Sequence, residues 1–392
     1  MSRPSTTSAY VAGDVSRKVQ PTVKLNGFGK AMSATASAAV MVTLFASACG
    51  SDNNASTSSP TNGASAECGG KNSLTAEGST AQQNAIAEFN KVWGQACPGK
   101  NLSYNPTGSG AGVQQFIAKQ VDIAGSDSPL AKDQVDPASQ RCSGNPAWNL
   151  PLVFGPVALA YNVAGVDKLV LNADVIAKIF TGAVTTWNDP AIAALNSGVS
   201  LPDTKITPVY RNDSSGTTDN FQKYLATAAP QSWTKGAGKE FQGGAGEGAQ
   251  KSAGVVQAVQ ATAGAIGYVE KGFVSQANLS MAQIDNGSGA VALTDESAGK
   301  AIAGAKFASE GKDLALDLNS LYGTKEPGAY PLVLATYEIV CSKGYDADTA
   351  AAVKSFLKVS ANQGQSRLSA AGYIPLPDTF KQRLLQSVDA IQ

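Results

Sequence analysis

Residues 150–161 read LPLVFGPVALAY, and residues 331–341 read PLVLATYEIVC. Both runs are long and apolar, a pattern typical of strands that are buried on both faces. We expect them to be the two segments at which the chain crosses between two lobes. The first lobe would then be discontinuous, with residues 68–154 and 334–392, and the second lobe would comprise residues 155–333.

A strand, a turn and a helix alternate along the rest of the chain from residue 72 onward. Apolar residues at helical spacing, such as Ile86, Phe89 and Trp93, follow short β-type stretches. This alternation predicts an α/β fold with two doubly wound lobes, in which ligands gather at the carboxyl ends of the strands. Strands are predicted at residues 72–76, 102–105 and 206–210, helices at residues 81–93, 174–180, 189–195 and 218–225, and a glycine-rich surface loop at residues 241–248.

The first 48 residues predict an export signal that is not part of the fold. An apolar stretch at residues 31–48 follows a basic segment that ends at Lys30, and this order is typical of a signal sequence. The alternative is a membrane-spanning anchor that stays uncleaved. The modest length and the Ser and Thr content of the stretch favour the signal sequence.

The end of this stretch indicates a lipid anchor. Residues 44–50 read LFASACG and are similar to a bacterial lipobox, in which the cysteine is acylated and becomes the mature N-terminus; Ala46 stands where leucine is usual. We therefore expect lipid on Cys49. Residues 49–67 are polar and small and predict a flexible tether.

Composition excludes several classes of function. Thirty Lys and Arg residues balance thirty Asp and Glu residues, so the chain lacks the basic footprint of a nucleic-acid-binding protein. The sequence contains no histidine, which removes Ser/His/Asp and Cys/His catalysis and the common histidine-ligated metal sites. Any chemistry must therefore use carboxylates, hydroxyls, Lys, Arg or backbone groups.

Four cysteines besides Cys49 predict two structural disulfides: Cys68, Cys97, Cys142 and Cys341. An even number of cysteines in an exported chain favours disulfides. The sequence leaves all three pairings open. Four buried free thiols are the alternative.

Three turns share one design, in which a strand feeds a turn rich in Ser, Thr and Gly and a helix starts at once. Such a turn presents backbone N–H groups, hydroxyls and the positive end of a helix dipole, which together suit a small oxyanion. A single one means little, since Ser and Thr are ordinary helix N-caps. The three turns are Gly78-Ser79-Thr80-Ala81, Thr107-Gly108-Ser109-Gly110 and Asp213-Ser214-Ser215-Gly216-Thr217.

Three charged residues lie next to these turns. Arg211 ends a predicted strand and can present a planar fork to two oxygens of an anion, although it could also be a surface arginine. Asp213 can hold that guanidinium or cap the following helix. Asp127 either caps a turn or accepts a hydrogen bond from a protonated ligand, which would favour phosphate over sulfate.

The ensemble of motifs resembles the PstS family of periplasmic-type phosphate-binding proteins, over nearly all of residues 68–392. Besides the three turns, the resemblance rests on GSDSPL at residues 125–130, IFTG at 179–182, WNDP at 187–190 and GAIGY at 264–268. It implies a fold like that of type II periplasmic binding proteins and a monomer. It also implies inorganic phosphate as ligand and the permease subunits of an ABC transporter as partners. With this resemblance we expect a protein that is not an enzyme and that holds no metal or cofactor.

Carried over residue by residue, the resemblance implies one phosphate site. Asp127 would accept the ligand's proton, and Asp213 would orient Arg211. The implied contact residues are Ser79, Thr80, Ala81, Ser109, Asp127, Arg211, Ser215, Gly216 and Thr217.

Two other classes of function compete with this interpretation. A hydrolase acting on phosphate esters could use Ser109 or Ser215, but Ser109 has no G-x-S-x-G context and no histidine can serve as base. A surface antigen would need no ligand. Residues 244–249 formally fit a dinucleotide fingerprint, without a strong strand before them.

Overall fold

The computed structural model describes residues 66–392. The predicted signal sequence at residues 1–48 and the predicted lipid-carrying Cys49 lie outside the described residues, and so does the tether up to residue 65. Within the described part, no helix is both long enough and apolar enough to cross a membrane.

Two long strands, β4 (Ala147–Asn162) and β14 (Val333–Cys341), run antiparallel through the middle of a nine-stranded sheet. β14 pairs with β4 up to Pro156, and β8 (Ala265–Glu270) pairs with the remainder of β4 from Val157 onward. One strand therefore serves two sets of partners. The prediction that the two apolar runs are the crossing strands is confirmed.

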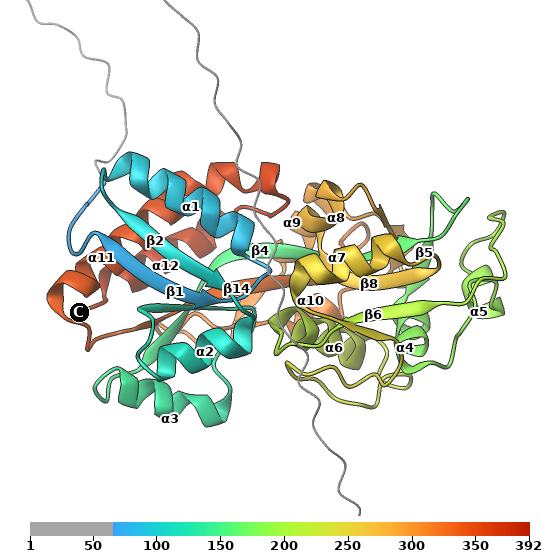
Figure 1. Ribbon diagram of the computed structural model, residues 1–392, viewed down its shortest axis with the longest axis horizontal. Coiled ribbons are helices and arrows are strands. Elements are labelled where there is room, and N and C mark those ends of the chain that lie inside the picture. The colour runs from blue at the N-terminus through green and yellow to red at the C-terminus, as the bar shows by residue number, and fades with distance from the viewer. Residues whose placement is uncertain (1–65) are drawn as a thin grey trace, which may run out of the picture. The chain divides into compact units, whose positions relative to one another are not determined.

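The first half of the sheet has the order β2-β1-β3-β14-β4, in which β1 runs parallel to both β2 and β3. Because parallel strands end at the same edge of a sheet, the turns that follow β1, β2 and β3 come together. In Figure 1, the helices α1, α11 and α12 lie on one side of these strands, and α2 and α3 lie on the other. The elements are β1 (Ser73–Gly78), β2 (Asn101–Pro106), β3 (Ile123–Ser126), α1 (Gln83–Ala96), α2 (Ser109–Ile117), α3 (Lys132–Arg141), α11 (Ala347–Val359) and α12 (Asp378–Asp389).

The second half continues from β4 in the order β8-β6-β7, with β6 parallel to both of its neighbours. A short strand, β9, pairs with β4 beside β8. In Figure 1, α7 lies on one side of β8 and β6, and α4 and α6 lie on the other side. The elements are β6 (Thr207–Arg211), β7 (Glu247–Ala249), β9 (Ser280–Met281), α4 (Ala173–Thr181), α6 (Gly216–Ala228), α7 (Lys251–Ala261) and α8 (Lys271–Gln276).

Shorter elements complete the fold. A three-stranded sheet has the order β11-β10-β5, and β12 pairs with β13. Two short 3-10 segments and a π-helical segment follow α11. The elements are β5 (Val170–Asn172), β10 (Gln283–Asp285), β11 (Ala290–Val291), β12 (Lys306–Phe307), β13 (Leu316–Asp317), α5 (Pro190–Ala193), α9 (Asp295–Ala303) and α10 (Asn319–Tyr322). The whole arrangement is the predicted α/β fold with two doubly wound halves.

A buried tyrosine on β8 joins β6 to α6. The Tyr268 ring stacks on Phe221, with 4.2 Å between ring centroids. Its hydroxyl accepts from the backbone N–H of Arg211 at 3.1 Å and lies 2.7 Å from Thr218 Oγ1. The end of β6 and the start of α6 are therefore held at a defined separation.

Two local predictions need correction. The helix predicted at residues 189–195 spans only Pro190–Ala193, because the Asn196 amide donates to the Ile192 carbonyl at 2.8 Å and ends the helix. The glycine-rich stretch at residues 241–248 is not wholly a surface loop. Its last two residues begin β7, and the Phe241 ring stacks on Tyr210 at 4.3 Å.

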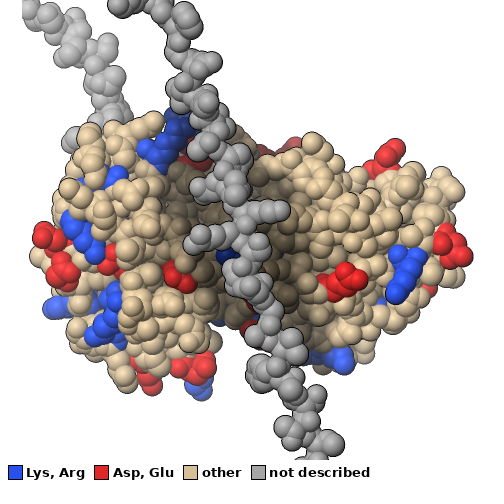
Figure 2. Space-filling view, in the orientation of Figure 1, with Lys and Arg blue, Asp and Glu red and all other residues tan. Residues whose placement is uncertain are grey.

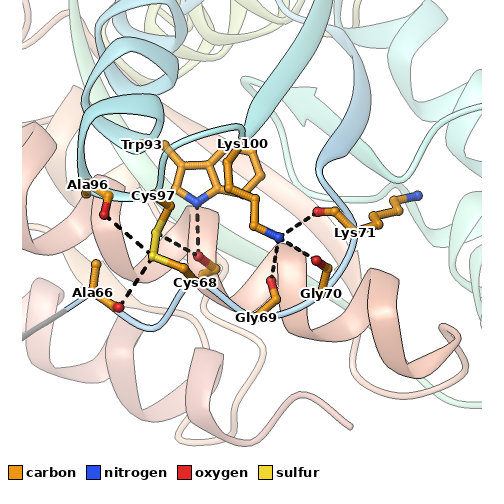
Figure 3. The surroundings of a disulfide bond; sticks show 10 residues. Ala66, Cys68, Gly69, Gly70, Lys71, Trp93, Ala96, Cys97 and Lys100 are labelled. Atoms are coloured by element: carbon orange, nitrogen blue, oxygen red, sulfur yellow. Dashed lines mark hydrogen bonds between the residues drawn. A yellow bond between two sulfur atoms is a disulfide. The ribbon is translucent and has the colours of Figure 1, made fainter.

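The four cysteines form two disulfides, Cys68–Cys97 and Cys142–Cys341, as the even count predicted. Figure 3 shows the first of them at the start of the described chain, beside a lysine whose ammonium group points at three backbone carbonyls. Lys100 Nζ donates to the carbonyls of Gly69 at 3.0 Å and Lys71 at 2.9 Å, and also to that of Gly70. Covalent and hydrogen bonds thus tie this entry segment to the end of α1.

Charged side chains of both signs are interspersed over the face in Figure 2, without a patch of a single sign. This distribution agrees with the equal numbers of acidic and basic residues. A surface of this kind does not suit the phosphate backbone of a nucleic acid.

We predict that removing Cys142–Cys341 costs more stability than removing Cys68–Cys97. The two bridges close loops of 199 and 29 residues, and the chain-entropy relation gives about 1–2 kcal/mol more for the longer loop. Urea titration of the two double Cys→Ala variants measures the free energies of unfolding. Equal losses would contradict the prediction, and alkylation without reduction should label none of the four cysteines in the wild type.

Candidate anion-binding site

Three strand-to-helix turns meet at the carboxyl edge of the sheet. They follow β1, β2 and β6 and lead directly into the region of α1, α2 and α6. The Gly110 N–H donates to the Ser214 carbonyl at 3.0 Å, which joins the second turn to the third. A Cβ at Gly110 would lie 2.1 Å from Ser214 Oγ, so this close approach requires glycine.

Asp127 lies immediately after β3, at the centre of the cluster, and is 2 % exposed. One carboxylate oxygen accepts from Ser79 Oγ at 2.6 Å and from Thr336 Oγ1 at 2.7 Å, and the other accepts from Ser109 Oγ at 3.1 Å. All three donors are hydroxyls from other elements. Asp127 is therefore a satisfied buried carboxylate and not a helix cap.

Gly216, the first residue of α6, approaches the same carboxylate from the other half of the sheet. A Cβ at this position would lie 2.5 Å from Ser109 Oγ and 2.7 Å from Asp127 Oδ2. Any larger residue would push the start of α6 away. The N-termini of α2 and α6 consequently converge on Asp127, and each brings the positive end of a helix dipole.

Arg211, the last residue of β6, is 2 % exposed. Its Nε donates to Asp213 Oδ1 at 2.7 Å, and its Nη2 donates to Asp213 Oδ2. The Lys251 N–H also donates to Asp213, at 3.0 Å. Of the two interpretations left open for Asp213, the structure has it holding the guanidinium, because the N-cap of α6 is Ser215.

The remaining predicted residues lie around these two charged centres. Thr80 Oγ1 is 2.8 Å from Ser252 Oγ, which also accepts from Arg211 Nη1 at 3.4 Å. Thr217 Oγ1 donates to Glu270 Oε1 at 2.6 Å. The Ala81 N–H, predicted as a ligand donor, here donates to Ser79 Oγ at 3.0 Å. The cluster brings together all ten predicted residues: Ser79, Thr80, Ala81, Ser109, Asp127, Arg211, Asp213, Ser215, Gly216 and Thr217.

Sequence reasoning missed four polar residues of the cluster: Thr336, Ser252, Glu270 and Asn220. Asn220 Nδ2 donates to the Asp127 carbonyl at 2.6 Å and so joins α6 to the end of β3. A signal for Thr336 existed, since it is one of the few polar residues in the apolar run at residues 331–341. Ser252 lies at a fourth strand-to-helix junction, which was hidden because β7 reads EGA and has little β propensity.

Burial sets the electrostatics of the site. It raises the pKa of Asp127 to about 6, although hydrogen bonds from Ser79, Thr336 and Ser109 act in the opposite direction. For Asp213, burial also acts to raise the pKa, but the hydrogen bonds and charge of Arg211 hold it below the usual value. Arg211 is connected through Ser252 to Thr80, and the neighbouring Ser79 donates to Asp127.

This arrangement suits a small anion that carries hydrogen on oxygen. The arginine and the helix N-termini attract negative charge, while ionised Asp127 can only accept a hydrogen bond. Within residues 66–392, no group of three or more acidic or cysteine side chains is placed to hold a metal ion.

Comparison with known proteins places the chain in a family. The family model described as PBP superfamily domain matches residues 54–363. The chain is 50 % identical over 374 residues to the phosphate-binding protein PstS 3 of Mycobacterium tuberculosis, covering 94 % of this chain and 100 % of that protein. It is also 50 % identical over 355 residues to PstS 2 of the same species, covering 89 % of this chain and 95 % of that protein.

Solved structures agree in fold. A high-affinity periplasmic phosphate-binding protein, PfluDING, bound with phosphate at pH 8.5, superposes with a TM-score of 0.65 at 22 % identity, covering 79 % of this chain and 92 % of that chain. At this identity the likeness concerns the fold alone. Given the family match and the level of identity to its relatives, this chain belongs to the PstS family of phosphate-binding proteins, within the PBP superfamily.

Proposed function

We propose that this protein binds inorganic phosphate between its two lobes and delivers it to the permease subunits of an ABC transporter. The lobes would comprise residues 68–154 with 334–392, and residues 155–333. Family membership supports phosphate as the ligand. The ten residues gathered around Asp127 and Arg211 would form the site.

The observation that carries the proposal is a hydrogen-bonded cluster. It connects buried Arg211 through Ser252 to the turn of Ser79 and Thr80, which donates to buried Asp127 beside the N-termini of α2 and α6. Arg211 has five N–H groups, of which three are engaged with Asp213 and Ser252, so two remain for a ligand. Ionised Asp127 repels a bare anion but accepts from a ligand hydroxyl. Phosphate keeps at least one hydrogen near neutral pH and sulfate keeps none, so phosphate fits both groups.

The protein is a binding protein and not an enzyme, as its family membership indicates. The hydrolase alternative finds no support in these relatives. The chain also lacks the histidine that the usual serine nucleophile needs as base.

Location follows from the same reasoning. Relatives and structural neighbours are phosphate-binding proteins, and PfluDING is a periplasmic one. Two disulfides suit an oxidising compartment outside the cytoplasm. We further propose a monomer held at the outer face of the cell membrane by lipid on Cys49, with residues 49–67 as tether.

We predict that Asp127→Asn relaxes selectivity for phosphate over sulfate. The wild type should discriminate by roughly 10⁴-fold, since a site built to accept a hydrogen bond rejects an analogue that cannot donate one. Asparagine is similar in size to aspartate but has an amide N–H that can donate to sulfate. The dissociation constant for sulfate divided by that for phosphate should therefore fall by roughly 100-fold or more. Calorimetric titration of both anions tests this, with the exposed Asp136→Asn as matched control. An unchanged ratio would make Asp127 a purely structural residue.

We predict that acid lowers the same selectivity in the wild type. Asp127 has a pKa of about 6, so it is ionised at pH 8 and increasingly protonated toward pH 5. A protonated carboxyl can donate to sulfate, so sulfate affinity relative to phosphate should rise as the pH falls. Titrations at pH 5, 6.5 and 8 check this direction. Phosphate itself loses its second hydrogen in this range, so the Asp127→Asn variant measures the pH dependence that comes from the ligand. A wild-type ratio that changes with pH no more than that of the variant would refute the assignment.

We predict that Arg211→Ala weakens phosphate binding by roughly 10- to 100-fold, because a charge-assisted hydrogen-bonded pair contributes about 1.5–3 kcal/mol. Arg367→Ala removes an exposed arginine and serves as the matched control. Calorimetry gives the dissociation constants, and thermal unfolding verifies that both variants fold. Equal affinities in the two variants would remove Arg211 from the site.

A further inference from the structure

A tyrosine hydroxyl holds the first turn of the candidate site from behind. Tyr104 lies on β2, and its Oη donates to the Ser79 carbonyl at 2.7 Å. The Ser79 N–H donates to the Gly125 carbonyl of β3 at 2.8 Å. Both peptide units that flank Ser79 therefore have a fixed orientation, one set by β3 and the other by the Tyr104 side chain.

The Tyr104 hydroxyl is itself held in place by Gln82. A carbonyl oxygen can only accept, so the single hydrogen of Tyr104 Oη goes to Ser79, and Tyr104 Oη accepts from its other neighbour. That neighbour is Gln82 Nε2, at 3.2 Å, on a fully buried side chain. Both groups fit because residue 125 is glycine: a Cβ on Gly125 would lie 2.1 Å from Gln82 Nε2 and 2.7 Å from Tyr104 Oη.

The peptide unit that Tyr104 holds has an unpaired N–H. In a trans peptide unit the C=O and the N–H point in opposite directions. The Ser79 C=O points at Tyr104, so the Thr80 N–H points away from it. Thr80 is 2 % exposed, yet its N–H has no hydrogen-bond partner among residues 66–392. Buried backbone N–H groups without a partner are rare, so this one is available to a ligand.

The same peptide unit lies between the two charged centres of the site. On one side, Ser79 Oγ donates to Asp127 Oδ1 at 2.6 Å. On the other, Thr80 Oγ1 is 2.8 Å from Ser252 Oγ, which accepts from Arg211 Nη1 at 3.4 Å. The unpaired N–H therefore belongs to the segment that connects the buried carboxylate to the buried guanidinium.

We propose that Tyr104, held by Gln82, is a positioning residue that turns the Thr80 N–H toward the bound phosphate. The inference rests on the proposed function and deepens it, because it identifies the group that orients one ligand donor. Tyr104 acts from behind the turn and touches no ligand. Without its hydrogen bond, the Ser79–Thr80 peptide unit can rotate and the ligand loses that donor.

A second tyrosine limits this effect to one peptide unit. Tyr373 Oη donates to the Ala81 carbonyl at 2.7 Å, and the Gln83 N–H donates to the Thr80 carbonyl at 3.3 Å. The start of α1 is therefore held without Tyr104. Loss of the Tyr104 hydroxyl should release the preceding peptide unit and leave the helix in place.

Three variants test this role. Tyr104→Phe removes the hydroxyl and keeps the ring. Gln82→Met removes the amide that holds the hydroxyl and keeps the length of the side chain. Tyr345→Phe is the matched control, because Tyr345 Oη also donates to a backbone carbonyl, that of Asp122, at 2.6 Å. Asp122 lies just before β3, at the opposite end of that strand from Asp127.

The first measurement is calorimetric titration of inorganic phosphate into the wild type and the three variants, with thermal unfolding as a check on folding. We expect Tyr104→Phe to weaken binding roughly 3- to 10-fold and Gln82→Met roughly twofold, because each loses one neutral hydrogen bond behind the turn. Tyr345→Phe should keep the wild-type dissociation constant.

The second measurement separates positioning from general stability. NMR of protein that carries isotope-labelled threonine follows the backbone amides without phosphate and at saturation, and Thr80→Ser identifies the Thr80 signal. In the wild type the Thr80 amide proton should move to lower field, as expected of an N–H that donates to an anion. In Tyr104→Phe this movement should be lost or reduced by roughly half or more, because the peptide unit is no longer held. Thr217, in the other half of the sheet, should respond as in the wild type.

Other outcomes overturn the inference. A wild type that binds no phosphate refutes the proposed function, and this inference with it. If the wild type binds phosphate but its Thr80 amide does not move, that N–H is no ligand donor and the inference alone fails. An equal movement in the wild type and Tyr104→Phe makes Tyr104 purely structural. If Tyr104→Phe does not fold, Gln82→Met decides, and wild-type affinity together with a wild-type Thr80 response in that variant refutes the inference.

Discussion

The antiparallel pairing of β4 with β14 is the interaction on which the rest of the structure depends. β14 pairs with β4 on one side and with β3 on the other, while the far part of β4 carries β8. A ladder of buried apolar residues therefore sets the distance between Asp127 after β3 and Arg211 at the end of β6. Thr336 lies at the one irregularity of this ladder and also donates to Asp127, so the central pairing and the candidate site share a residue.

Buried charge decides the character of the site. Carboxylates and a guanidinium away from water are tolerated only when hydrogen bonds satisfy them. Asp127 relies on three hydroxyls, whereas Arg211 relies on one bidentate carboxylate. Four hydroxyls of this cluster, those of Ser79, Ser109, Thr217 and Thr336, thus donate to protein carboxylates. A hydroxyl that donates its hydrogen to a carboxylate has only lone pairs left and can accept from a ligand. A hydroxyl that keeps its hydrogen can donate to one.

Much of the fold and part of the site could be predicted from the sequence, because their causes are local. Apolar runs, helical spacing and Ser/Thr/Gly turns identified the crossing strands and the three turns that meet at Asp127. Thr336 and Glu270 could not be assigned, since their roles depend on which distant strands pair. Ser252 was missed because β7 owes its strand conformation to β6 alongside it and not to its own residues. Disulfide pairing stayed open for the same reason, as only the fold brings Cys142 to Cys341.

The bridge between Cys68 and Cys97 also defines a path for mechanical force. Tension applied to the chain before Cys68 passes through the disulfide into the end of α1 and bypasses β1, which lies between β2 and β3 in the sheet. Lys100 also holds the backbone carbonyls of the three residues just after Glu67 and Cys68, namely Gly69, Gly70 and Lys71. Pulling on this end therefore loads a covalent bond before any strand can be peeled away, and reduction of this bridge alone should convert a mechanically stiff attachment into one that yields from the first strand inward.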